Sequence, residues 1–229
     1  GGIDASLVTV IAADAIGAEH VHAVALPSRY STEHSLTDAE KLCANLGIEL
    51  RTIDAAAELG CDIVSVGLHR PLTDAQTDAF WFWTAAGPTE DDSPEAWRAA
   101  IVRFRELGQH AAELGMQLSL EMYEDTLLGS SSSAVQLVEE IGLDCVGLNP
   151  ALANIYRLHR RTESFLEALE RCMPYTNYWH VKSYYRDVDP GTGSFVAIPA
   201  PMSSGSMDYR AAIKVALSLG FAAPFCVEH

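Results

Sequence analysis

The sequence has little positive charge. Its 229 residues include 15 lysines and arginines against 31 aspartates and glutamates, a formal net charge of −16 with a pI near 4.7. This charge repels both a nucleic-acid backbone and an anionic membrane surface. We therefore expect no nucleic acid and no membrane among the partners of the protein, and a small-molecule substrate instead. The sequence leaves a homo-oligomer open.

Long apolar runs are also missing. The densest run, Ala79–Trp83, has five residues, whereas a helix that crosses a bilayer needs about 20. No basic segment followed by an apolar core is found near residue 1, so a secretory leader is not expected. With 48% apolar and 20% charged residues, the composition is that of a globular protein of one or two domains.

Cysteine is scarce, and its spacing shows no pairs. The five cysteines never form a CxxC motif: Cys43, Cys61, Cys145, Cys172 and Cys226. We expect reduced, mostly buried thiols in a cytoplasmic protein. The chain begins at Gly1 without a methionine and ends at His229 directly after an apolar strand, which predicts a fragment at both ends.

The sequence does contain a repeated alternation of strand and helix. Eight strands are expected, near residues 21, 48, 62, 116, 145, 178, 195 (Phe195–Pro199) and 224. Eight parallel strands with intervening helices indicate an α/β fold of the (β/α)8 TIM-barrel type, which spans roughly 200–400 residues. An open doubly wound sheet is the competing architecture.

The connection after the third expected strand is unusually long. It runs over Leu68–Asp92, and a loop of this length is usually functional or disordered. Its aromatic run Phe80–Trp83 suits a wall for a sugar ring, or equally plain packing. A helix is expected to follow, with Ser93 as its N-cap and Pro94 as its first residue.

Along three of the expected strands, apolar and polar residues alternate, and each strand ends near a polar residue. In a barrel, chemistry gathers at the carboxyl ends of the strands, on side chains that point inward. The apolar residues near 116–121, 178–182 and 224–228 alternate with polar ones, which predicts that Glu121, His180 and Glu228 point inward together. Two carboxylates and an imidazole suit a divalent metal such as Mn²⁺, Mg²⁺ or Zn²⁺.

This set of residues suits proton-transfer chemistry. A metal that holds a carbonyl and a hydroxyl makes the adjacent C–H acidic, and Glu121 and Glu228 on opposite sides can then pass the proton. That is the chemistry of an isomerase or epimerase. The alternative interpretation is that the glutamates are solvated strand ends and His180 is a satisfied core histidine.

Four motifs carry a family resemblance: Leu118–Glu124 (LSLEMYE), Val146–Pro150 (VGLNP), Trp179–Lys182 (WHVK) and Cys226–His229 (CVEH). Through them, residues 54–229 resemble the sugar phosphate isomerase/epimerase family of xylose-isomerase-like TIM barrels. The resemblance implies a metal held by Glu, Asp, His and Glu from four strand ends. Glu121, His180 and Glu228 match three of these, and Ala151 stands where the family has its Asp. A site with three ligands should bind the metal more weakly.

Three further residues are candidates for binding the sugar. Asn154 stands where the family often has a polar group on the substrate side, although it could equally cap a turn. Lys182 and Arg186 suit a sugar phosphate or acid, whereas the plain alternative is a solvated basic rim.

The first 53 residues resemble a different family. The segments Gly1–Val8 (GGIDASLV), Leu26–Ser31 (LPSRYS) and Ser35–Glu40 (SLTDAE) are similar to the ATP-pyrophosphatase domain of NAD synthetase. The resemblance implies a nucleotide-binding loop at Gly1, Gly2 and Asp4, where backbone amides cradle ATP phosphates. Ala5 replaces the serine that ends the family's loop.

The two resemblances together predict a chimera joined near residues 53 and 54. Residues 1–53 would form a partial synthetase-like β-α-β segment in place of the first two βα units, and residues 54–229 would supply barrel units three to eight. Two alternatives stay open: a fragment of an ATP-dependent NAD synthetase, and a fold chimera without catalytic activity.

Overall fold

The computed structural model describes residues 10–15, 17–18, 23–25, 50–52, 57 and 59–228. The chain divides into two units, residues 1–61 and 62–229. In the first unit residues 10–15 are helical, and β1 (Ala23–Ala25) pairs in parallel with β2 (Leu50–Thr52). The two strands fall where the sequence predicts strands, near residues 21 and 48. The predicted nucleotide-binding residues Gly1, Gly2 and Asp4 lie outside the described residues.

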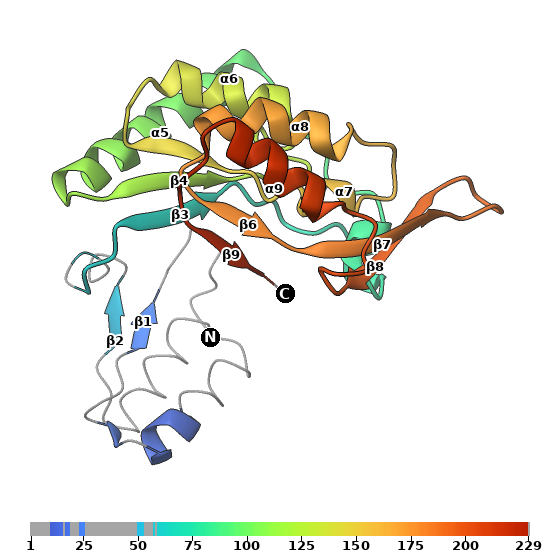
Figure 1. Ribbon diagram of the computed structural model, residues 1–229, viewed down its shortest axis with the longest axis horizontal. Coiled ribbons are helices and arrows are strands. Elements are labelled where there is room, and N and C mark those ends of the chain that lie inside the picture. The colour runs from blue at the N-terminus through green and yellow to red at the C-terminus, as the bar shows by residue number, and fades with distance from the viewer. Residues whose placement is uncertain are drawn as a thin grey trace. The chain divides into compact units, whose positions relative to one another are not determined.

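In the second unit, neighbouring parallel strands follow the order of the sequence (Figure 1). The strands β3 (Ile63–Gly67), β4 (Gln117–Glu121) and β5 (Val146–Asn149) form one parallel sheet. A bridge joins β5 to the residues just before β6 (Trp179–Val181), and β6 pairs in parallel with β9 (Phe225–Val227). This order lacks the reversal that characterises a doubly wound sheet and agrees with the predicted barrel.

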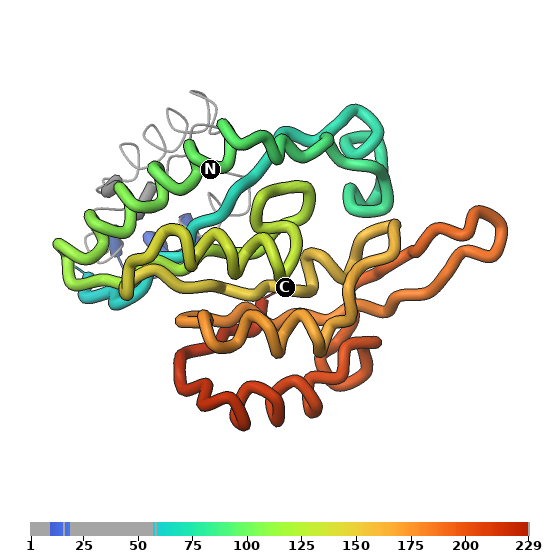
Figure 2. The backbone as a smooth tube through the Cα atoms, turned by 90° about the horizontal axis from the view of Figure 1, so that it is seen from above, coloured from blue at the N-terminus to red at the C-terminus, as the bar shows by residue number. Residues whose placement is uncertain are grey.

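Four helices cover one side of these strands: α5 (Pro94–Glu113), α6 (Ser131–Ile141), α8 (Phe165–Cys172) and α9 (Tyr209–Ser218). They pack against one another in chain order, as the succession of green, yellow, orange and red in Figure 2 shows. Capping residues close in the sequence mark where two of these helices begin. Ser93 accepts a hydrogen bond from the backbone N–H of Ala96 and Pro94 opens α5, as predicted, and Asp208 caps α9.

The core lies between the helices and the outer face of the strands. Its largest fully buried apolar side chains include Leu120, Leu137, Ile141, Leu148, Leu169 and Trp179. The opposite, inner face carries polar residues such as Ser65 and Asn149, whose side chains hydrogen-bond to each other. In the register of the sheet, Ser119 is paired with Ser65 and Glu121 with Asn149, so β4 presents Ser119 and Glu121 on this inner face, as predicted. On β9, however, Phe225 and Val227 are 57% and 50% exposed, so their outward side chains are not covered as the pattern predicts.

The long connection after β3 is ordered by its own short helices, α4 (Asp74–Asp78) and η2 (Phe82–Thr84). Of its aromatic run, Phe80 is 90% exposed, whereas Trp83 is buried and donates a hydrogen bond from Nε1 to the carbonyl of Ala197 at 2.9 Å. Trp83 therefore packs the loop against the protein, which favours the packing interpretation for this residue.

One predicted barrel strand is wrong. Residues near 195 form β8 (Phe195–Ala200), which pairs antiparallel with β7 (Ser183–Val188) in a hairpin that extends from the sheet (Figures 1 and 2). The sequence Asp189–Gly193 supplies the turn: Gly193 donates to the carbonyl of Asp189 and has a φ of 72°. A turn of this chemistry reverses the chain without a crossover helix, which a parallel partner would require.

The remaining short helices are α7 (Ala153–Tyr156) and η3 (Met173–Tyr175). Among the described cysteines, none of which is in a disulfide, Cys172 is buried but Cys61 and Cys226 are exposed. The prediction of mostly buried thiols is wrong for these two, and Cys43 lies outside the described residues. No helix in the described ranges combines the length and the apolarity that a membrane span needs.

Candidate active site

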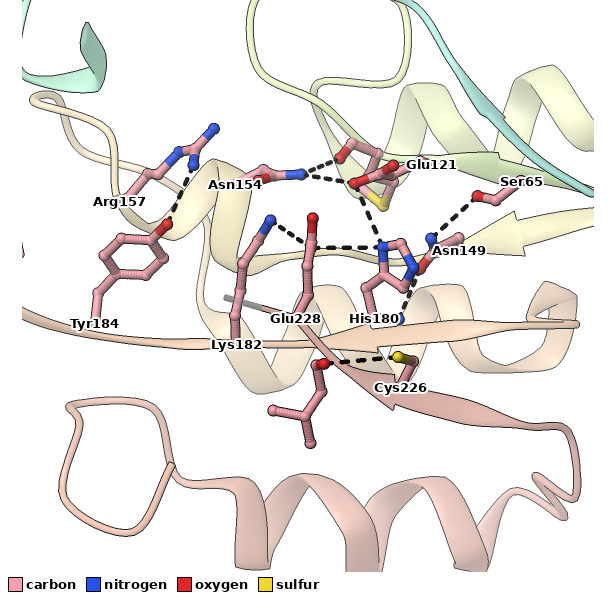
Figure 3. A network of polar contacts seen from close by, with 12 residues as sticks. Ser65, Glu121, Asn149, Asn154, Arg157, His180, Lys182, Tyr184, Cys226 and Glu228 are labelled. Carbon is pink, nitrogen blue, oxygen red and sulfur yellow. Dashed lines mark hydrogen bonds and ion pairs between the residues drawn. The ribbon is translucent and has the colours of Figure 1, made fainter. Parts of the chain in front are cut away.

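Three predicted residues converge at the ends of three strands (Figure 3). Glu121 ends β4, His180 lies within β6, and Glu228 directly follows β9. The Nδ1 atom of His180 is 3.6 Å from Oε1 of Glu121 and 3.5 Å from Oε2 of Glu228. One ligand atom from each of the three residues lies within 4.8 Å of the others. The strand parity that predicted this convergence therefore holds in the structure.

The geometry fits a divalent cation. The Nδ1 atom of His180 is buried and forms no hydrogen bond within the described part of the chain. Ligand atoms held at about 2.0–2.2 Å from a metal at tetrahedral angles lie about 3.4 Å apart, close to the two distances from this nitrogen. A buried polar atom without a partner is costly, and a cation between the two carboxylates would satisfy it.

Two asparagines hold the cluster from behind. Asn149, at the end of β5, accepts a hydrogen bond on Oδ1 from the backbone N–H of His180 at 2.8 Å. Asn154 is fully buried on α7, and its Nδ2 donates to the carbonyl of Met122 at 2.9 Å and to Oε1 of Glu121 at 3.3 Å. These amides fix the positions from which Glu121 and His180 face each other.

Lys182 also reaches the cluster, but through Glu228. Its Nζ atom donates to Oε2 of Glu228 at 2.6 Å, and its side chain is 11% exposed. His180 and Lys182 are two residues apart along the chain, so the strand periodicity directs both side chains to the same face. Figure 3 shows both pointing toward Glu228.

The surrounding charges keep Glu121 ionised. Burial by itself raises the pKa of Glu121, but the interaction with the nearby imidazole of His180, together with Lys182 and Asn154, outweighs it and holds that pKa below its ordinary value. Nearby, burial raises the pKa of Tyr178, as does its hydrogen bond with Cys226. An ionised Glu121 is the form that binds a cation or accepts a proton.

A cavity of about 410 Å³ borders the cluster on the inner face of the strands. Its described lining comprises Asp62, Ile63, Ser65, Tyr178, His180 and Pro224. Most of these residues stand at or just before the starts of their strands, and neither Glu121 nor Glu228 is among them. The ring of Tyr178 lies edge-on to that of His180, with centroids 5.1 Å apart.

Two of the positions considered in the sequence contribute no ligand atom to this cluster. Arg186, predicted as a substrate-binding residue, lies on β7, where its guanidinium donates to the carbonyls of Leu158 and Arg160 and lies 3.8 Å from the centroid of Phe195. None of the contacts found for Arg186 in the described part reaches Glu121 or Glu228. Ala151 is fully buried just beyond β5 and offers no ligand atom.

The structure contains a buried ion pair near the site that the sequence did not predict. Glu124, three residues after Glu121, pairs with Arg157 at 2.7 Å, and their side chains are 3% and 6% exposed. Arg157 also donates to the hydroxyl of Tyr184 at 3.1 Å and lies 4.7 Å from the ring centroid of Trp83. Through these contacts, the pair links Trp83 in the loop after β3 and Tyr184 in the β7–β8 hairpin to the segment that follows β4.

Glu124 and Asn149 both lie within motifs that drew attention in the sequence. The motifs alone do not indicate their partners, because these lie between about 30 and 85 residues away along the chain. A buried Glu–Arg pair has no local signature, so the sequence pattern carries no signal for it.

Comparison with known proteins bears on this site. A family model described as xylose isomerase-like TIM barrel matches residues 12–229. A xylose isomerase-like TIM barrel protein from Mycobacterium smegmatis, solved in complex with magnesium, is 35% identical, with a TM-score of 0.71 over 90% of this chain and 77% of that one. D-psicose 3-epimerase with D-tagatose, from Clostridium cellulolyticum H10, shares the fold at 13% identity, with a TM-score of 0.56 over 99% of this chain and 80% of that one.

A second similarity covers a short segment. A glutamine-dependent NAD(+) synthetase from Rhodobacter capsulatus is 57% identical over 54 residues, which are 24% of this chain and 10% of the synthetase. The chain therefore spans about a tenth of the length of this curated relative. Both resemblances predicted from the sequence motifs are confirmed.

Proposed function

This chain belongs to the xylose isomerase-like TIM barrel family, and on that premise we propose that it is a metal-dependent isomerase or epimerase. Its substrate is a sugar or a sugar-derived hydroxy-carbonyl compound. The observation that carries the proposal is the buried Nδ1 of His180, which lies at almost equal distances from Glu121 and Glu228 and forms no hydrogen bond with any described residue.

The comparisons support the class of chemistry. The relative from Mycobacterium smegmatis was solved with magnesium, and the structural neighbour from Clostridium cellulolyticum is an epimerase solved with a sugar. The oxygen-rich donor set of two carboxylates and one imidazole suits Mg²⁺, Mn²⁺ or Zn²⁺. A bound cation would supply a Lewis acid that polarises the carbonyl of the substrate and acidifies the C–H of the adjacent hydroxyl-bearing carbon.

The chain's own residues then move the proton. One of the two carboxylates, Glu121 or Glu228, removes the proton from the carbon, and the other returns it from the opposite side. Glu121 can accept the proton because its carboxylate is ionised at neutral pH, with a pKa below the ordinary value. Asn154 holds its Oε1 in place, and Asn149 holds the backbone of His180.

The test is exchange of a substrate proton with solvent. The purified chain is incubated with Mn²⁺ and a panel of ketohexoses in D₂O, and proton NMR follows the loss of the signal at the carbon next to the carbonyl. We expect exchange that EDTA stops and that Glu121→Gln abolishes, because the base is then missing.

Glu106→Gln is the matched control. Glu106 is exposed on α5 and pairs only with Arg103 among the contacts described, so its loss should leave the exchange unchanged. Exchange that persists in EDTA and in the Glu121→Gln variant would contradict the proposal, as would the absence of exchange with every ketohexose and metal tested.

A further inference from the structure

The ammonium group of Lys182 occupies one ligand of the proposed metal site. Its Nζ donates to Oε2 of Glu228 at 2.6 Å, the same oxygen that lies 3.5 Å from Nδ1 of His180. A hydrogen bond between an ammonium and a carboxylate is short and strong, because both partners carry charge. Oε2 of Glu228 is therefore already neutralised by a cation that belongs to the chain.

The structure holds Lys182 in this position through its backbone. The residue lies between β6 and β7, where its N–H donates to the hydroxyl of Tyr209 at 3.3 Å and its carbonyl accepts from the same hydroxyl at 2.7 Å. Tyr209 is itself buried at the start of α9. The backbone of Lys182 is thus clamped, and its side chain reaches Glu228 along the inner face (Figure 3).

The contact between Lys182 and Glu228 reduces the negative charge that the cluster offers to a metal. Glu121 and Glu228 contribute two negative charges, and Lys182 removes the effect of one of them. Ala151 adds none. A divalent cation that approaches Glu228 therefore meets a like charge only one hydrogen bond away. Lys182 and His180 are 11% and 17% exposed, so water screens this charge only in part, although Glu228 itself is 37% exposed.

From these contacts we infer that Lys182 is an internal cation that competes with the divalent metal for Glu228. Without metal, the ammonium group of Lys182 neutralises the carboxylate of Glu228. A bound metal must share Glu228 with the ammonium or displace it. This role differs from contact with a sugar phosphate, and it rests on the proposed function, because it requires that the cluster binds a metal.

Calorimetric titration with Mn²⁺ tests the inference. Lys182→Met removes the competing charge and keeps the aliphatic stem, so we expect it to tighten Mn²⁺ binding by at least about tenfold. Lys182→Arg keeps a cation near Glu228 and should bind Mn²⁺ as weakly as the parent chain. If the Met variant does not fold, Lys182→Gln removes the same charge with a polar side chain.

Thermal melting supplies a second readout. In EDTA, Lys182→Met should melt at a slightly lower temperature than the parent chain, because the carboxylate of Glu228, which is 37% exposed, loses its ion pair. Mn²⁺ should restore the melting temperature of the variant more than it raises that of the parent, since a tighter ligand stabilises the native state more at a given concentration.

The outcomes separate the two proposals. Mn²⁺ binding by the parent chain that is unchanged or weaker in Lys182→Met and Lys182→Gln would overturn the role of Lys182 and leave the metal site standing. If neither the parent chain nor any Lys182 variant binds Mn²⁺, Mg²⁺ or Zn²⁺, the proposed function and this inference both fail.

Discussion

Arg157 donates two hydrogen bonds to a single oxygen of Glu124, at 2.7 Å from Nη2 and 3.2 Å from Nε. The second oxygen of that carboxylate, Oε2, is buried and has no hydrogen-bond partner among the described residues. Burial raises the pKa of Glu124, and the charge of Arg157 offsets this only in part. The pair therefore depends on both members, since each would be an uncompensated buried charge alone.

The first prediction concerns this pair. Arg157→Met and Glu124→Leu should each lower the free energy of unfolding by about 3–5 kcal/mol, because each leaves one charge buried without its partner. The double variant should lose much less than the sum, since it buries no charge. Urea denaturation of the four proteins measures the coupling, and strictly additive losses would contradict a mutually dependent pair.

The second prediction uses the residue that replaces the family's aspartate. Ala151→Asp should supply a fourth ligand, the third carboxylate, and tighten Mn²⁺ binding by at least tenfold, about 1.4 kcal/mol. The melting temperature should rise only when Mn²⁺ is present, because binding stabilises the native state by mass action. Calorimetry with and without Mn²⁺ measures both effects.

Glu121→Gln in the Ala151→Asp background is the control, and it should abolish the gain. Without a metal site, Ala151→Asp would change the stability in the opposite direction. If no metal binds at this end of the strands, a new buried aspartate has no partner and destabilises the fold whether Mn²⁺ is present or not. A loss of stability that Mn²⁺ does not reverse would therefore argue against the metal site.

The third prediction is a pH dependence in EDTA. The pKa of Glu121 is lower in the folded protein than its ordinary value. Its carboxylate therefore stabilises the fold fully above the unfolded pKa of about 4.3, and this contribution is lost as the pH falls through the folded pKa. Urea denaturation should show that Glu121→Gln costs stability at neutral pH and that this cost shrinks on acidification. Glu106→Gln should show no such trend, and a cost that grows toward acid pH would refute the assignment.

The fourth prediction concerns the synthetase-like segment. Because Ala5 replaces the serine of the phosphate loop and the chain spans about a tenth of its synthetase relative, we expect no adenylation of nicotinate adenine dinucleotide. An assay for ATP-dependent pyrophosphate release measures this. Release above background that disappears in Asp4→Asn would show that the segment retains the activity.

Much of the fold follows from local signals in the sequence. The helix that begins at Pro94 has its N-cap and its proline side by side in the chain, so no distant contact is needed to predict its start. The convergence of Glu121, His180 and Glu228 was also predictable. Side chains alternate with a period of two along a strand, and the carboxyl ends of parallel strands meet at one edge.

Only the tertiary structure decides which groups pair. The segment Phe195–Ala200 has the composition of a barrel strand, yet it pairs with Ser183–Val188, because the intervening turn places the two strands side by side. The contact between Lys182 and Glu228 joins residues 46 positions apart, and that between Glu124 and Arg157 joins residues 33 positions apart. Sequence patterns report the periodicity of one segment at a time, whereas these distances depend on which segments become neighbours and how closely their side chains pack.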